Sequence, residues 1–167
     1  MLASPIAAQV PQTDSAAFSR IAVDGGIGLI ATSPKALAGY RLELSAALPH
    51  KRAVIVRYTK VQEYCLFAEC EFPDRVSDVA AMYGWMPNTP YGGATLAAGA
   101  ALLTSYEKDH SGFGNTRSRD LNPAIPIEIT GYLMPAPYLA IGLSGTADLA
   151  PDHSIAGLFL AIRLSFD

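Results

Sequence analysis

The chain has 167 residues, of which 50% are hydrophobic and 16% charged, and its net charge is −3. This length fits one domain, but an average soluble domain carries about 25% charged residues, so the chain is short of charge for a surface that faces water. It contains no basic tract, and we therefore expect no nucleic-acid partner. Its longest stretch of low polarity, 92–103, is shorter than the ~20 residues that a spanning helix needs.

The first 17 residues resemble the end of a signal peptide, because the small residues Ala7 and Ala8 follow a short apolar run. They lack a basic start, so two interpretations stay open. Either Met1 lies inside a longer signal peptide, or the likeness is accidental. We therefore predict an N-terminal tail over 1–17 and a single domain over 18–167.

Alternation of apolar and polar residues is the dominant pattern in the rest of the chain, and it predicts strands. Eight stretches show it in chain order: 18–32, 39–48, 53–61, 76–86, 92–106, 124–134, 138–149 and 154–166. Each has one apolar face and one face with polar or charged residues. In 39–48, for example, Tyr40, Leu42 and Leu44 alternate with Arg41 and Glu43.

The connections between these strands alternate in length. The first, third and fifth (33–38, 62–75 and 107–123) are long, whereas the second, fourth and sixth (49–52, 87–91 and 135–137) are short and contain proline. An up-and-down sheet with this pattern has tight turns at one end and loops at the other. That is the layout of outer-membrane barrels.

The alternating pattern fits two kinds of barrel equally well, because either face of the sheet could point into the barrel. In a soluble lipocalin-like barrel that binds an apolar ligand, the apolar face points inward. In a membrane barrel it faces lipid. Low charge, alternating connections and aromatic residues near the strand ends favour the second barrel. We assign one rim to Phe18, Tyr83, Trp85, Tyr91, Tyr138 and Phe166, and the other to Tyr40, Tyr58 and Tyr106.

We therefore predict an all-β, eight-stranded, antiparallel up-and-down transmembrane β-barrel in a bacterial outer membrane. Its final strand, "GLFLAIRLSF" (157–166), resembles the closing strand of outer-membrane proteins, which ends on an aromatic residue that the barrel-assembly machinery recognises. Leu164 and Phe166 match that ending, although Asp167 follows the aromatic residue and Ala161 stands where glycine is frequent.

The layout also resembles a family of small eight-stranded outer-membrane barrels from environmental bacteria. The resemblance rests on "YTKVQEYCLFAECEFPDRVSDVAAMYGW" (58–85) and on "IPIEITGYLMPAPYLAIGLSGTADL" followed by "SIAGLFLAIRLSF". It implies a fold and an outer-membrane location. It implies no activity, because none is established for that family.

A membrane barrel would place six charged residues in its lumen: Arg41, Glu43, Arg57, Glu128, Asp148 and Arg163. Buried charges must pair, and three arginines against three acids balance. Because eight strands enclose an interior that side chains can fill, we expect a plug and no conducting pore. Arg41 and Asp148 are the two that could instead reach solvent near the rims.

Two further groups are candidates for chemistry. The only cysteines, Cys65 and Cys70, lie in a predicted external loop, where we favour a disulfide over free thiols and expect no metal site. Asp109, His110 and Ser111 suggest a membrane-embedded lipid A-modifying enzyme as an alternative, since such enzymes use these residue types. Contiguous side chains rarely form a nucleophile–base pair, so we interpret them as a polar loop and leave catalysis open.

The function predicted from sequence is therefore a small, non-conducting outer-membrane barrel with a structural role, or with a surface-interaction role carried by its external loops. We expect outer-membrane lipid and the barrel-assembly machinery as partners, a monomeric state, and no cofactor.

Overall fold

The computed structural model describes residues 20–32, 35–62, 75–89, 91–108, 117–136, 138–151 and 154–166. The predicted tail 1–17 lies outside these residues. Eight long strands account for most of the described chain: β1 (Ile21–Thr32), β2 (Lys35–Leu48), β3 (Arg52–Gln62), β4 (Arg75–Trp85), β6 (Gly92–Lys108), β7 (Arg117–Ala136), β8 (Leu139–Leu149) and β9 (Ile155–Phe166). A two-residue strand, β5 (Asn88–Thr89), pairs with the start of β6, and a 3-10 turn, η1 (Pro49–Lys51), joins β2 to β3. The described part of the chain contains no helix that is long and apolar enough to cross a membrane.

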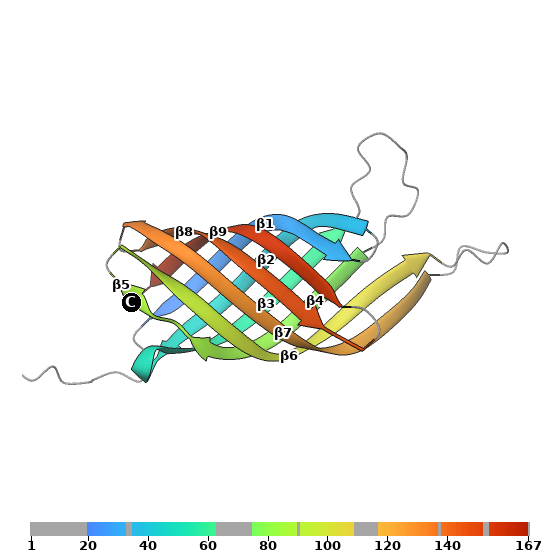
Figure 1. The fold of residues 1–167 in the computed structure, drawn as a ribbon, viewed down its shortest axis with the longest axis horizontal. Coiled ribbons are helices and arrows are strands. Elements are labelled where there is room, and N and C mark those ends of the chain that lie inside the picture. The colour runs from blue at the N-terminus through green and yellow to red at the C-terminus, as the bar shows by residue number, and fades with distance from the viewer. Residues whose placement is uncertain are drawn as a thin grey trace, which may run out of the picture.

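The strands form one closed antiparallel barrel. Each long strand pairs with the next long strand in the chain, β4 with β6 included, and β1 pairs with β9 from Ile21↔Phe166 to Ala31↔Ala156. Figure 1 shows the first and last strands side by side, in blue and red. Every long strand thus has two neighbours, which satisfies the backbone hydrogen bonds that a membrane interior cannot. The predicted fold class is confirmed.

Tight turns occupy one end of the barrel, with the C-terminus beside them (Figure 1). In η1, His50 and Lys51 adopt left-handed backbone angles, with φ of 62° and 59°. The opposite end carries the connections 33–34, 63–74, 109–116 and 150–154. The first of these was expected to be long, and that prediction is wrong, because β2 begins at Lys35. The beginning of β2 was missed because its inward side chain is the apolar Leu37, whereas inward side chains later in β2 are polar or charged.

Strands β6 and β7 are longer than predicted, because residues 107–108 and 117–123 of the predicted connection belong to them. The two remain paired out to Lys108↔Arg117, and this hairpin projects beyond the other strands (Figure 1). The prolines that suggested a loop are accommodated in two ways. Pro123 lies beyond Ile125↔Leu149, where β8 no longer pairs with β7. Pro126 lies where the β6–β7 register is interrupted, so its missing N–H is not needed there.

The outer wall of the barrel is apolar. Leu42, Ile127, Ile141 and Leu160 belong to the apolar strand faces that a membrane barrel would turn toward lipid, and all four are exposed. They belong to rows of exposed large hydrophobic residues on every long strand, including Ile27, Leu29, Leu44, Val56, Val79, Leu96, Leu102, Ile129, Leu143 and Leu158. A contiguous apolar wall of this extent is unsuited to water, whereas it matches the outward band of a membrane barrel. It rules out the soluble alternative, in which these side chains would converge on a core.

Aromatic side chains mark the two ends of this wall. Tyr83, Trp85, Tyr91, Tyr138 and Phe166 are exposed at the end with the tight turns. Nearer the other end, the rings of Tyr40 and Tyr58 lie 6.2 Å apart between centroids. Such belts are typical of the two membrane–water interfaces. The two remaining aromatic residues of the predicted rims are Phe18 and Tyr106. Phe18 and the side chain of Tyr106 lie outside the described part.

Glycine makes room for one large side chain inside the barrel. Phe159 of β9 is fully buried, and its ring lies between Gly28 of β1 and Gly157 of its own strand. A Cβ atom on Gly28 would come within 2.7 Å of this ring and within 2.1 Å of the Leu158 carbonyl oxygen. The ring fills the barrel interior beside the charged residues, and the guanidinium of Arg41 lies over it, 5.6 Å from its centroid.

Candidate functional site

The inside of the barrel is lined with charged side chains. All six predicted lumen residues point inward, and each is 5% exposed or less: Arg41, Glu43, Arg57, Glu128, Asp148 and Arg163. They come from β2, β3, β7, β8 and β9, so they meet only because the sheet closes. Arg41 and Asp148, for which solvent exposure at a rim was left open, are buried as well.

Two lumen acids were missed by the sequence analysis. Asp24 of β1 and Asp78 of β4 are each 2% exposed and join the same interior. The alternation of strand faces could have identified both acids. Asp24 follows the outward Val23 and Asp78 precedes the outward Val79, so each acid lies on the inward face. The predicted balance of three arginines and three acids is therefore wrong. Five carboxyl groups face three guanidinium groups among the described lumen residues.

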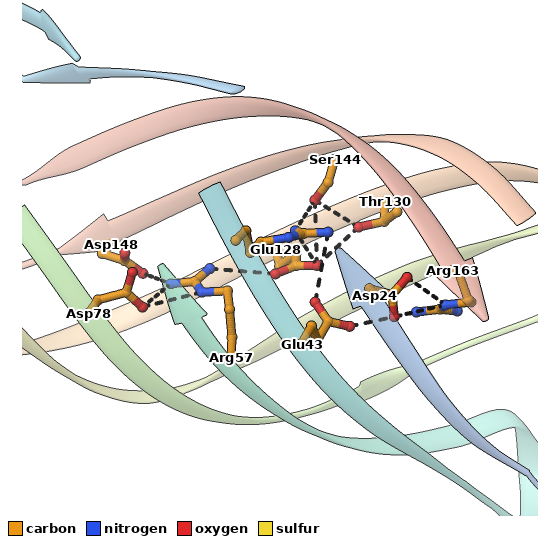
Figure 2. Close-up of polar contacts among 10 residues, drawn as sticks. Asp24, Glu43, Arg57, Asp78, Glu128, Thr130, Ser144, Asp148 and Arg163 are labelled. Carbon is orange, nitrogen blue, oxygen red and sulfur yellow. Dashed lines mark hydrogen bonds and ion pairs between the residues drawn. The ribbon is translucent and has the colours of Figure 1, made fainter. Parts of the chain in front are cut away.

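Arg57 is the centre of the first charge cluster. Its Nη2 lies 2.9 Å from Asp78 Oδ2 and also contacts Asp148 Oδ1. Its Nε donates to the same Asp78 oxygen at 3.3 Å, and its Nη1 lies 3.5 Å from Glu128 Oε2. Figure 2 shows the guanidinium pointing toward the two aspartates on one side and Glu128 on the other. One buried cation thus binds acids from three different strands.

Glu128 links the first cluster to a second one. Its Oε1 lies 2.9 Å from Arg41 Nη1 and accepts hydrogen bonds from Thr130 Oγ1 at 3.0 Å and Ser144 Oγ at 3.4 Å. Arg41 also donates to Ser144. With Arg57 on the other oxygen, Glu128 is the carboxyl group with the most donors, as the dashed lines of Figure 2 show.

Arg163 completes the second cluster near the end with the tight turns. Its Nε donates to both carboxylate oxygens of Asp24, at 2.8 and 3.0 Å. Its guanidinium lies over the ring of Tyr132, 4.6 Å from the centroid, and Nη1 contacts Met86 Sδ at 3.3 Å. This explains the arginine in the closing strand, which faces inward and pairs with the first strand of the barrel.

Apolar layers close the lumen on both sides of the charges. At the end with the longer connections lie the buried side chains of Ile30, Leu37, Val61, Leu103 and Ile155. Toward the tight turns, the lumen contains those of Ala53, Ile55, Met82, Met86 and Ala97. Between these layers the charged residues contact one another across the interior. Buried side chains of the described residues therefore occupy the lumen, as expected for an eight-stranded barrel.

The other predicted site residues lie outside the described chain. These are Cys65 and Cys70, whose disulfide stays a prediction, and Asp109, His110 and Ser111. Within the described ranges, no group of three or more histidine, cysteine, aspartate or glutamate side chains is arranged to hold a metal ion.

Three solved structures share this fold. The attachment invasion locus protein Ail of Yersinia pestis aligns over 90% of this chain and 99% of that chain, with a TM-score of 0.61 and 14% identity. Neisserial surface protein A aligns over 90% and 98%, with a TM-score of 0.60 and 14% identity. The N-terminal β-barrel domain of Pseudomonas aeruginosa OprF aligns over 87% and 97%, with a TM-score of 0.59 and 11% identity.

No family model matches the chain, and no curated protein matches it. The predicted membership of a family from environmental bacteria therefore stays a prediction. At 11–14% identity the solved structures establish the fold, which is that of small bacterial outer-membrane barrels. Together with the apolar wall, this fold supports a location in the bacterial outer membrane.

Proposed function

We propose that the protein is a non-conducting outer-membrane barrel that displays its longer connections at the cell surface. The observation that carries the proposal is the filled lumen, in which charged side chains pair between two apolar layers. An interior of this kind favours a rigid anchor over a channel. Activity then resides in the parts that extend beyond the membrane.

The projecting β6–β7 hairpin supports a role at the surface. It carries the strand pairing out to Lys108↔Arg117, past the last β7–β8 pair at Ile125↔Leu149. The neighbours named above include a protein described as an attachment invasion locus protein and one described as a surface protein. These descriptions fit barrels whose exposed ends meet other molecules, and we extend that general role to this chain.

The composition of the connections points to the kind of partner. The connection 63–74, "EYCLFAECEFPD", has four acidic residues and no basic one. Ail has been solved in complex with the heparin analogue sucrose octasulfate, which is a polyanion. Acidic residues repel such a ligand, so we propose that this connection favours cationic groups on a partner.

We propose three properties of the assembled protein. Its apolar wall contacts outer-membrane lipid, and its closing strand, which ends at Phe166, engages the barrel-assembly machinery. It acts as a monomer, because closure through β1–β9 and β4–β6 pairs all eight long strands without a second copy. No feature of the described surface calls for nucleic acid.

The purified protein should produce no ion conductance in a planar lipid bilayer. Among the described residues, the charged side chains of the lumen are buried and apolar layers lie on both sides of them, so we expect no path for water and ions. A general porin, inserted from the same detergent, is the positive control. Reproducible unit steps of current, seen only after the folded protein is added, would disprove the non-conducting proposal.

The β6–β7 hairpin should face the outside of intact cells. We would introduce Asp120→Cys on the projecting part of β7, in a background with Cys65→Ser and Cys70→Ser. A membrane-impermeant thiol reagent should label this variant in intact cells. The matched control, Thr89→Cys in the tight turn that contains β5, should be labelled only after the outer membrane is opened. The reverse labelling pattern would overturn the proposed orientation.

A further inference from the structure

The second charge cluster contains one more acid than it has arginines. Arg41 and Arg163 face Asp24, Glu43 and Glu128, and all five side chains are buried. Arg57 approaches this cluster only through Glu128, and it is already bound to two aspartates. An unpaired buried charge is costly, so the surplus carboxyl group needs a compensating positive charge or a proton.

The positions of Glu43 and Glu128 indicate which form the surplus takes. Both carboxyl groups lie against the guanidinium of Arg41, with Nη2 3.8 Å from Glu43 Oε2 and Nη1 2.9 Å from Glu128 Oε1. Two ionised carboxylates that share one buried site repel each other, and a proton on one of them removes this repulsion. The pair then consists of one carboxylic acid and one carboxylate.

The surrounding donors show which of the two is ionised. Glu128 receives Arg41, Arg57, Thr130 and Ser144, which together occupy both of its oxygens. Glu43, by contrast, has no hydrogen-bond donor on Oε2. The guanidinium nitrogens nearest to Glu43 are those of Arg163 at 3.6 Å and Arg41 at 3.8 Å, both beyond hydrogen-bond distance.

We propose that Glu43 is a neutral carboxylic acid at neutral pH and donates its proton to the Glu128 carboxylate. The proton makes the charge of the second cluster zero, since two arginines then balance Asp24 and Glu128. The charged groups around Glu43 come from every side of the lumen. They are Asp24 on β1, Arg41 on β2, Arg57 on β3, Glu128 on β7 and Arg163 on β9, with Asp78 on β4 and Asp148 on β8 behind Arg57.

Infrared spectroscopy tests the proposal directly. The folded protein, in a detergent without ester groups at neutral pH, should show the carbonyl stretching band of a protonated carboxylic acid. Incorporation of carbon-13 glutamate should move this band, because it arises from a glutamate. The part of the band that carbon-13 glutamate moves should disappear in Glu43→Gln and persist in the matched control Asp148→Asn. The labelling experiment needs no substitution, so it remains decisive if a variant does not fold.

Stability gives a second readout that distinguishes the two glutamates. The amide in Glu43→Gln can still donate to Glu128, so the urea midpoint should stay near that of the wild type. Glu128→Gln removes the ionised acceptor of two arginines and should lower the midpoint clearly. No carboxylic acid band in the wild type, a band that carbon-13 glutamate does not move, or equal loss of stability in the two variants would overturn the proposal.

Discussion

Replacing Arg57 with methionine should lower the free energy of unfolding of the barrel by about 3–5 kcal/mol, because it leaves buried carboxylates without their partner. The Arg57 side chain is fully buried and is the common partner of Asp78, Asp148 and Glu128. Methionine has a similar length and fills much of the space, so the loss reports on charge more than on packing. The measurement is urea unfolding in detergent micelles, followed by the fluorescence of Trp85, the only tryptophan.

The matched control for this experiment is Arg52→Met, at the start of the same strand. Arg52 is exposed and lies over the ring of Tyr83, 5.8 Å from its centroid. An exposed contact of this kind contributes about 0.5–1 kcal/mol, so the control should lose little stability. Adding Asp78→Asn and Asp148→Asn to Arg57→Met should restore part of the lost stability, because the two carboxylates left without a partner are then removed. Equal losses in Arg57→Met and Arg52→Met would refute the role of Arg57 as the centre of a buried cluster.

Replacing Ile129 with arginine should cost about 2–4 kcal/mol in a lipid bilayer, the cost of a charge on the lipid face at the midplane of a barrel. Ile129 is 62% exposed on the outer wall of β7. The same substitution at Ile141 should cost less, because Ile141 is the third residue of β8 and lies close to the tight turn before it. Unfolding in vesicles by urea measures both variants.

The control for depth in the membrane is Leu121, which lies on β7 like Ile129. Leu121 is 56% exposed, a fraction similar to that of Ile129, but it lies on the projecting part of β7 beyond the pairing with β8. Because this part extends past the apolar wall, Leu121→Arg should cost only about 0–1 kcal/mol. If arginine is tolerated equally at positions 121 and 129, the wall around Ile129 does not face lipid.

Much of the fold could be read from local pattern. The two-residue period of a strand assigns each side chain to a face, whatever the rest of the chain does. Leu42 and Arg41 therefore had to lie on opposite faces of β2, and proline in a tight turn limits where a strand can end. For the same reason, the inward positions of Asp24 and Asp78 were available from parity, although the sequence analysis did not draw on them.

Other features depended on contacts between distant parts of the chain. The ends of β6 and β7 could not be placed from sequence, because pairing between the two strands carries Pro123 into the sheet at an edge where its missing N–H is harmless. The alternating pattern also did not determine which strand face points into the barrel. A barrel with polar residues inside and one with apolar residues inside both repeat every two residues. The structure decided between them by placing the apolar rows on the outer wall.

The sequence by itself thus determined the strands, their two faces and the residues available to the lumen. Only the tertiary structure decided which of these residues pair. Glu128 on β7 meets Arg41 on β2, although the two strands are not neighbours in the sheet, and Arg163 on β9 meets Asp24 on β1 because those strands close the barrel. The tilt and stagger of a closed sheet set the height of each side chain in the lumen. They follow from the register of all the strands together, which no local stretch of sequence contains.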